Sequence, residues 1–189
     1  MATTTPTTRR LTADEYLARG ETERWEELLD GEIVVNEPRP LHGLMVARIM
    51  APLHVWCNAA PGRGLVLPPI DVRMGDRDVF APDLCWIAEA QRPADLDALF
   101  PGIPDLCVEI RSPSTWRHDL GHKKRVYEQR TTGELWLVDT RARSVLVYRR
   151  SRPQAPTFDV ELELGAGESL TSPRLPGFSL SIDELFGGI

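Results

Sequence analysis

Two acidic residues lie within or directly beside apolar, strand-like runs of the sequence, and any fold of the chain must account for both. Asp83 directly precedes the run 84–87, Leu-Cys-Trp-Ile, and Glu109 lies within the run 106–110, Leu-Cys-Val-Glu-Ile. A carboxylate in an apolar environment costs free energy unless it has a partner. A divalent cation held by both side chains would be such a partner.

The positions of the two acids also predict a pairing register. If the two runs pair antiparallel with Asp83 opposite Glu109, then Cys85 falls opposite Cys107, because the position numbers of the two pairs have the same sum. Residues that face each other on one side of a sheet have Cβ atoms about 4.5–5.5 Å apart. Two carboxylates at that spacing reach one ion, so we expect them to lie less than about 8 Å apart.

The length and composition fit one globular domain. The chain has 189 residues, of which 42% are hydrophobic and 26% are charged, enough for a sizeable core. We expect one domain over residues 12–189 after a disordered lead-in over residues 1–11, which has no apolar segment typical of a secretory signal. No run approaches the ~18–20 apolar residues of a membrane span. These features predict a cytoplasmic protein without a membrane partner.

Charge and cysteine content restrict the partners further. The net charge of -6 provides no global attraction for nucleic acid, although a local basic patch can supply it. The three cysteines include no CxxC pair, which favours buried, reduced thiols over a zinc site. The one dense basic cluster either contacts phosphates or exposes its side chains on a hairpin. Its members are Arg141, Arg143, Arg149, Arg150 and Arg152.

Capping and turn motifs organise the first half of the chain. Thr12 and Glu15 have the capping-box spacing, which predicts a helix over about 13–19. The dipeptide Asp30-Gly31 predicts a hairpin turn between strands at 25–29 and 32–35. Apolar residues recur every three or four positions, which predicts a long helix over 42–60. Strands are then expected at 65–67 and 70–74, and a polar turn at 75–78 leads into the strand that carries Asp83.

The second half predicts strands around one crossover helix. The strand at 106–110 is followed by a helix over about 118–130 and by the continuous apolar run 134–139, typical of a strand buried on both faces. Strands at 145–148 and 158–164 follow, the last alternating as an edge strand does, and a second capping box at 181–184 predicts a C-terminal helix. This order predicts an α+β (α/β) fold, a sheet with helices packed on it.

Seven segments together resemble a known family. They are Glu27–Val34, His42-Gly43, Pro82-Asp83-Leu84, Val108-Glu109-Ile110, Ser112–Thr115, Asp119–Lys123 and Leu135–Asp139. In their order and spacing they resemble the Uma-two family of restriction-endonuclease-like proteins, from about Thr12 to Leu185. That family belongs to the PD-(D/E)XK nuclease superfamily. The resemblance therefore implies a restriction-endonuclease-like fold, with a central mixed β-sheet flanked by helices.

The resemblance also implies roles for individual residues. The superfamily's aspartate and glutamate match Asp83 and Glu109, which would hold Mg²⁺, or Mn²⁺ as a substitute, together with the backbone carbonyl of Ile110. The superfamily's lysine normally lies two residues after the glutamate, where this chain has Arg111. In the Uma-two family the lysine matches Lys123 instead. We assign to Lys123 the positioning or activation of water, because an arginine does not release its proton.

Each of these residues has a structural alternative. Asp83 and Glu109 would form a salt bridge with Arg111 or Lys123, and Arg111 would hold either a phosphate or a structural carboxylate. Lys123 shares a helix face with Asp119 by four-residue spacing, so its alternative is an ordinary surface ion pair. On either interpretation, a partly exposed helix lysine contributes little to stability, and Lys123→Ala is expected to leave the fold intact.

Further residues are candidates for the same site. Glu27 matches a family glutamate and would approach the metal, with a solvent-facing strand position as its alternative. His42 either starts a helix or contacts the substrate or a metal-holding residue. Tyr127 continues the helix face of the lysine by four-residue spacing. His118 and His122 have the spacing of a helical metal pair, but no third ligand accompanies them, which favours a solvated helix face.

Two hypotheses of function follow. A cation held by two carboxylates lowers the pKa of bound water and neutralises charge that develops on a phosphodiester. The first hypothesis is therefore a Mg²⁺-dependent endonuclease that hydrolyses phosphodiester bonds in DNA. The second is a catalytically idle nuclease fold kept as a nucleic-acid or protein-binding module, with a homodimer as one form. The acidic balance and Arg111 favour the second hypothesis.

Overall fold

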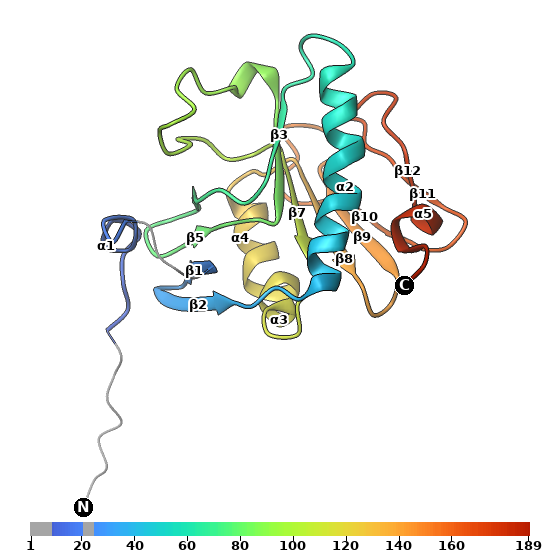
Figure 1. Ribbon diagram of the computed structural model, residues 1–189. Helices are drawn as coiled ribbons and strands as arrows, with labels where there is room; N and C mark the ends of the chain where they lie inside the picture. Colours follow the sequence, from blue (N-terminus) through green and yellow to red (C-terminus); the bar gives the residue numbers. More distant parts are fainter. Residues whose placement is uncertain (1–8, 21–24) are drawn as a thin grey trace, which may run out of the picture.

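Helices and strands follow one another in the predicted order in the computed structural model, which describes residues 9–20 and 25–189 (Figure 1). The helices are α1 (Ala13–Leu17), α2 (Pro40–Asn58), α3 (Trp116–His118), α4 (Lys124–Gln129) and α5 (Ile182–Phe186), with a 3₁₀ helix η1 (Glu89–Gln91) and a π-helical segment η2 (Asp119–Lys123). The strands are β1 (Trp25–Leu29), β2 (Glu32–Asn36), β3 (Leu65–Leu67), β4 (Val72–Arg73), β5 (Val79–Phe80), β6 (Leu84–Ile87), β7 (Leu106–Ile110), β8 (Glu134–Asp139), β9 (Ser144–Arg149), β10 (Val160–Leu164), β11 (Ser169–Leu170) and β12 (Leu180–Ser181). The two-residue strands β11 and β12 were not predicted, because they are too short to show alternation. The strand predicted to carry Asp83 is divided into β5 and β6, and Asp83 lies between them.

A six-stranded mixed sheet forms the centre of the fold. Its strand order is β10-β9-β8-β7-β6-β3, in which β7 and β8 are parallel and the other neighbours are antiparallel. The parallel pair is joined by the crossover that contains α3, η2 and α4, since parallel neighbours need a long connection. β8 is buried along nearly its whole length and β10 lies at the edge, as predicted. The α+β (α/β) fold with a central mixed sheet is confirmed.

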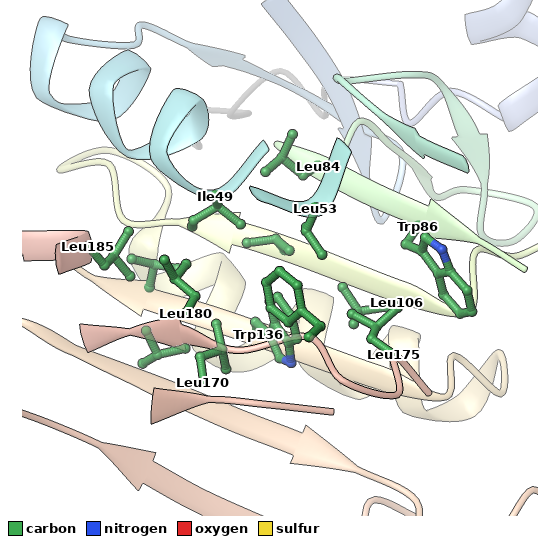
Figure 2. Close-up of a cluster of buried hydrophobic side chains, with 14 of the residues drawn as sticks. Ile49, Leu53, Leu84, Trp86, Leu106, Trp136, Leu170, Leu175, Leu180 and Leu185 are labelled. Carbon is green, nitrogen blue, oxygen red and sulfur yellow. The ribbon is translucent and has the colours of Figure 1, made fainter. Parts of the chain in front are cut away.

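Helices cover both faces of this sheet. On one face, Met45, Ile49 and Leu53 of α2 pack with Leu84 and Trp136 in the apolar cluster that Figure 2 shows, together with residues of the C-terminal segment. On the other face, α3 and α4 pack against the alternate residues of the same strands. The three-and-four spacing predicted this face of α2, and side-chain alternation in the strands separates the two clusters.

A second, smaller sheet has the order β2-β1-β5-β4. At its β1–β2 turn, Asp30 and Gly31 have φ angles of 47° and 79°, the positive values that a two-residue hairpin turn requires. Leu28 of β1 pairs with Val79 of β5, which attaches the hairpin to the chain shortly before Asp83. The hairpin is therefore confirmed, and it lies in a sheet of its own.

The crossover between β7 and β8 differs from the single helix predicted over 118–130. The three residues of α3 lead into the π-helical segment η2, and α4 continues from it. π-helical turns are rare in proteins, and those that occur are often at functional sites. Here η2 has Asp119 at one end and Lys123 at the other.

The ends of several elements show the expected capping. Thr12 and Glu15 form both hydrogen bonds of the capping box of α1. α2 begins two residues earlier than predicted because Pro40, whose fixed φ suits a helix, occupies its first position. In the part of the chain that the structure describes, no helix is both long and apolar enough to cross a membrane.

Residues 1–8 of the predicted lead-in lie outside the described residues. In the rest of that segment, the backbone N–H of Leu11 donates to the carbonyl of Gly31 at 2.9 Å. The side chain of Arg10 pairs with Asp30 at the same turn. Residues 10 and 11 thus lie against the β1–β2 hairpin, in contrast to the disorder expected for them.

Candidate active site

The pairing of β6 with β7 follows the predicted register. Cys85 is the partner of Cys107, and the paired residues end with Leu84 and Val108. Continued by one residue, the same register sets Asp83 opposite Glu109. The two acids also share the sheet face of the two cysteines, because each lies two positions from one of them.

Asp83 is held at this position by two contacts. Its Oδ2 accepts a hydrogen bond of 2.7 Å from the backbone N–H of Ile110, the residue after Glu109. Its Oδ1 lies 3.0 Å from Nε2 of His42 in the first turn of α2. That pair has ion-pair distance without hydrogen-bond alignment, since His42 Nε2 has no hydrogen-bond partner among the described residues. His42 therefore lies in the first turn of α2, which begins at Pro40, and contacts a site residue.

The Lys123 ammonium lies among three carboxylates. Its Nζ is 2.6 Å from Oε1 of Glu109, 2.8 Å from Oε1 of Glu27 and 3.7 Å from Oδ1 of Asp119. The residue is 1% exposed, so the alternative interpretation of Lys123 as a surface ion pair is wrong. The four-residue spacing to Asp119 was right, but it faces inward, because the π-helical segment packs against the sheet.

Glu27 and Tyr127 complete this arrangement. Glu27 is 5% exposed, so its interpretation as a solvent-facing strand residue is wrong, and its Oε1 also accepts a hydrogen bond of 2.8 Å from the N–H of Ala81. The Tyr127 hydroxyl donates to Oε1 of Glu109 at 2.5 Å. Both contacts orient carboxylates toward the ammonium. We term Glu27, Asp83, Glu109, Asp119 and Lys123 the acidic cluster.

Burial and mutual attraction shift the pKa values of the acidic cluster. Burial would lower the pKa of Lys123, but the carboxylates of Glu109, Glu27 and Asp119 outweigh it and raise that pKa well above its usual value. Burial raises the pKa of Glu109 well above its usual value, against the attraction of the ammonium. Burial also raises the pKa of Asp119 to about 7, again against that attraction. The lysine is therefore charged at neutral pH, and the carboxyl groups compete for it.

The acidic cluster contains more buried carboxylate than buried cation. Three acids are buried beside the ammonium of Lys123, and a fourth, Asp83, is buried beside His42. Asp119 Oδ1 has no hydrogen-bond partner among the described residues. Within residues 9–20 and 25–189, no three His, Cys, Asp or Glu side chains are arranged to hold a metal ion. A Mg²⁺ ion, however, keeps several waters and needs only one or two carboxylates. The excess negative charge and the all-oxygen donors of Asp83 and Glu109 thus fit Mg²⁺ or Mn²⁺.

Arg111 is bound elsewhere. Its Nη1 donates to both carboxylate oxygens of Asp139, at 2.9 and 2.8 Å, and its guanidinium lies 5.3 Å from the centre of the Trp116 ring. Of the two roles considered for Arg111, a structural carboxylate partner is the one observed. Asp83 and Glu109 correspondingly have no salt bridge with Arg111 in the described structure; their basic neighbours are His42 and Lys123.

The other basic candidates have mainly structural contacts. Arg150 is buried and its Nε donates to the carbonyl of Thr132 at 3.3 Å, so the picture of uniformly exposed hairpin arginines is wrong for it. Arg143 donates to the carbonyl of Phe186 at 2.8 Å. His122 lies 2.6 Å from Oδ1 of Asp78, which ties it to the turn before β5 and departs from the solvated face expected for it.

Asp119 is the site residue that the sequence interpretation did not select. It was noted only as a helix neighbour of Lys123. The residue is 1% exposed, and its Oδ2 lies 3.5 Å from the Thr115 hydroxyl, which itself is 2.7 Å from the Ser112 hydroxyl. The four-residue spacing to the lysine was the available signal, but that spacing is equally common on solvated helix faces.

The candidate site thus has two carboxylates set by adjacent strand ends, with a lysine from the following helical segment beside one of them, Glu109. The family model described as "Putative restriction endonuclease", Uma2, matches residues 13–183, so the chain belongs to this family. The fold is similar to the crystal structure of "a putative nuclease belonging to DUF820" from Anabaena variabilis, with a TM-score of 0.79 at 22% identity over 93% of this chain and 97% of that one. No curated protein matches the chain.

Proposed function

We propose that the protein is a metal-dependent endonuclease that hydrolyses phosphodiester bonds in DNA. The observation that carries the proposal is the register that sets Asp83 opposite Glu109, with Lys123 2.6 Å from Glu109. Membership of a family of restriction-endonuclease-like proteins supports it. The same membership makes nucleic acid the partner we expect.

Asp83, Glu109 and the carbonyl of Ile110 would hold Mg²⁺ or Mn²⁺. Such an ion, when bound, lowers the pKa of a coordinated water and neutralises charge on the phosphate. The Ile110 N–H fixes one oxygen of Asp83, His42 lies 3.0 Å from the other, and Tyr127 fixes one oxygen of Glu109. Partners of this kind hold ligating carboxylates in a defined orientation.

Lys123 acts in this proposal as a donor. Its pKa is raised by three neighbouring carboxylates, so it stays charged at neutral pH and does not take a proton from water. A charged ammonium instead donates hydrogen bonds to an attacking water or to a phosphate oxygen. Between the two roles assigned to it from sequence, positioning therefore fits better than activation.

The second candidate is an idle nuclease fold that binds nucleic acid or protein, alone or as a homodimer. The observation in its favour is that Arg111, at the usual position of the catalytic lysine, is paired with Asp139. In that case Lys123 would serve only to neutralise buried acids. The two candidates differ in whether metal binding leads to cleavage.

Cleavage of supercoiled plasmid, linear duplex and single-stranded RNA with Mg²⁺ or Mn²⁺ tests the proposal. We expect metal-dependent nicking of DNA by the wild type and by Asp97→Asn, a control at an exposed position, and none by Asp83→Asn. Mn²⁺ should raise the Tm of the wild type but not of Asp83→Asn. A rise in Tm without cleavage of any substrate would favour the idle fold. The absence of both cleavage and a rise in Tm would refute the metal site.

A further inference from the structure

Asp119 has an oxygen atom that the fold leaves unused. Oδ1 is buried, has no hydrogen-bond partner among the described residues, and lies 3.7 Å from the Lys123 ammonium. The other oxygen has only the long contact of 3.5 Å with the Thr115 hydroxyl. A buried acceptor without a donor costs free energy, because its lost hydration is not replaced. The fold retains this atom at the end of η2 at a cost in stability.

The other two partners of the ammonium are already shared. Glu27 Oε1 also accepts from the N–H of Ala81, and Glu109 Oε1 also accepts from the Tyr127 hydroxyl. An ammonium has three N–H donors, but only two of these acceptors lie within hydrogen-bond distance of Lys123. One N–H of the ammonium therefore has no acceptor within hydrogen-bond distance among these three carboxylates. Asp119 Oδ1, in turn, is an acceptor without a donor. The gap of 3.7 Å is longer than a hydrogen bond.

Engagement of Glu109 by a cation would break this balance. The oxygen that accepts from Lys123 belongs to Glu109, which is also a proposed metal ligand. A metal ion bound to this carboxylate would weaken its interaction with the ammonium. The ammonium lies in a site almost closed to water, so a lost partner has to be replaced from within the protein. Asp119 Oδ1 is the unpartnered acceptor on the same helical segment.

We propose that Asp119 is a positioning residue: the Lys123 ammonium shifts onto its free oxygen when Glu109 engages the cation. This inference rests on the proposed function, because it needs a cation at Glu109. Asp119 then fixes where the ammonium lies while the substrate is bound. The Ser112 and Thr115 hydroxyls, which precede it in the chain, support its other oxygen.

Asp119→Asn, with Asp97→Asn as the matched control, tests the inference by two independent measurements. The first is kinetic: kcat should fall about 100-fold, the usual effect of a misplacement near 1 Å, with KM and Mg²⁺ affinity within about threefold of the wild type. Asp119→Glu, which extends the carboxylate toward the ammonium, should recover part of kcat. A merely structural role would not give this separation of kcat from KM.

The second measurement does not depend on cleavage. The ¹⁵N-labelled Lys123 ammonium is followed by NMR, with Lys123→Met used for assignment. In the wild type, Mg²⁺ should shift this resonance and leave it sharp. In Asp119→Asn, Mg²⁺ should broaden it or abolish it, because the ammonium no longer has a single partner.

The outcomes separate the inference from the proposed function. An unchanged kcat and an unchanged NMR response in Asp119→Asn would overturn the inference alone. A loss of Mg²⁺ affinity of more than about tenfold would also overturn it, because Asp119 would then be a metal ligand. A wild type that neither binds Mg²⁺ nor cleaves would defeat both. If Asp119→Asn does not fold, Thr115→Val, which frees Oδ2 of Asp119, should lower kcat about tenfold, and wild-type kcat would refute the inference.

Discussion

Removal of the Lys123 ammonium should be strongly destabilising, contrary to the expectation from sequence that Lys123→Ala leaves the fold intact. In Lys123→Met the volume is nearly kept, so the change isolates the charge. Breaking a buried ion pair by removing one partner costs about 3–5 kcal/mol. The three carboxylates that lose their cation at 2.6, 2.8 and 3.7 Å place this variant in that range. For a chain of this size the Tm should fall by roughly 10 °C.

The loss should depend on pH. The carboxyl groups of Glu109 and Asp119 already have raised pKa values, and loss of the ammonium raises them further in the folded state. A carboxyl group with a raised folded pKa contributes stability at low pH that is lost as the pH rises through that pKa. The cost of Lys123→Met should therefore be greater at pH 8 than at pH 5, where protonation removes part of the repulsion.

Urea unfolding at the two pH values measures this cost, with Lys124→Met as the neighbouring control. The Lys124 side chain is 28% exposed and lies 3.9 Å from Glu161, so its loss should cost about 1 kcal/mol or less. Glu27→Gln added to Lys123→Met should recover part of the stability, because it removes one unpaired acid. The reasoning fails if Lys123→Met is as stable as Lys124→Met, or if its cost does not grow with pH.

Three further predictions concern other parts of the chain. Gly64→Ala should cost several kcal/mol, because φ is +67° and a Cβ would overlap the carbonyl of Ile87, whereas Gly62→Ala, at φ +79° in open space, should cost about 1–2 kcal/mol; thermal unfolding compares the two. Partial burial would raise the pKa of Asp139, but backbone N–H groups and Arg111 outweigh it and lower that pKa. Its stabilisation should be present above about pH 4 and be lost as the pH falls through the lower folded pKa, and Arg111→Ala should weaken that acid dependence in urea titrations at pH 3–7. Thiol counting on protein denatured without reductant should find three free groups, because all three cysteines are free; one free group would contradict this. In the folded protein the thiols should react slowly, because all three are buried and burial raises the pKa of Cys85 to about 12.

Much of the fold was predictable because its signals are local. The turn at Asp30-Gly31 and the Thr12 cap depend on residues within a few positions. The pairing of Cys85 with Cys107 was predictable for a different reason, namely that two acids in apolar runs had one plausible common partner. In that case the need of two buried acids for a partner predicted a long-range contact that no local pattern indicates.

The parts that were not predictable depend on packing between distant segments. Glu27 reaches Lys123 across 96 positions, because the hairpin sheet packs beside the crossover, and no local pattern encodes that approach. The burial of Lys123 and Asp119 was equally unpredictable, because the four-residue spacing is the same on a solvent-exposed and on a buried helix face. The π-helical form of η2 was not predicted either, because the sequence over 118–130 indicated a helix without distinguishing its type.

The concentration of charge in the acidic cluster has an evolutionary consequence. Replacing a whole buried ion cluster with apolar residues is often neutral or stabilising, whereas losing one member is strongly destabilising. In a lineage that no longer uses this site, each single substitution in the acidic cluster would therefore lower the stability of the protein. Stability would recover only after several members had been replaced. Relatives of this chain should retain Glu27, Glu109, Asp119 and Lys123 together or lack them together, and intermediates with a single member missing should be scarce.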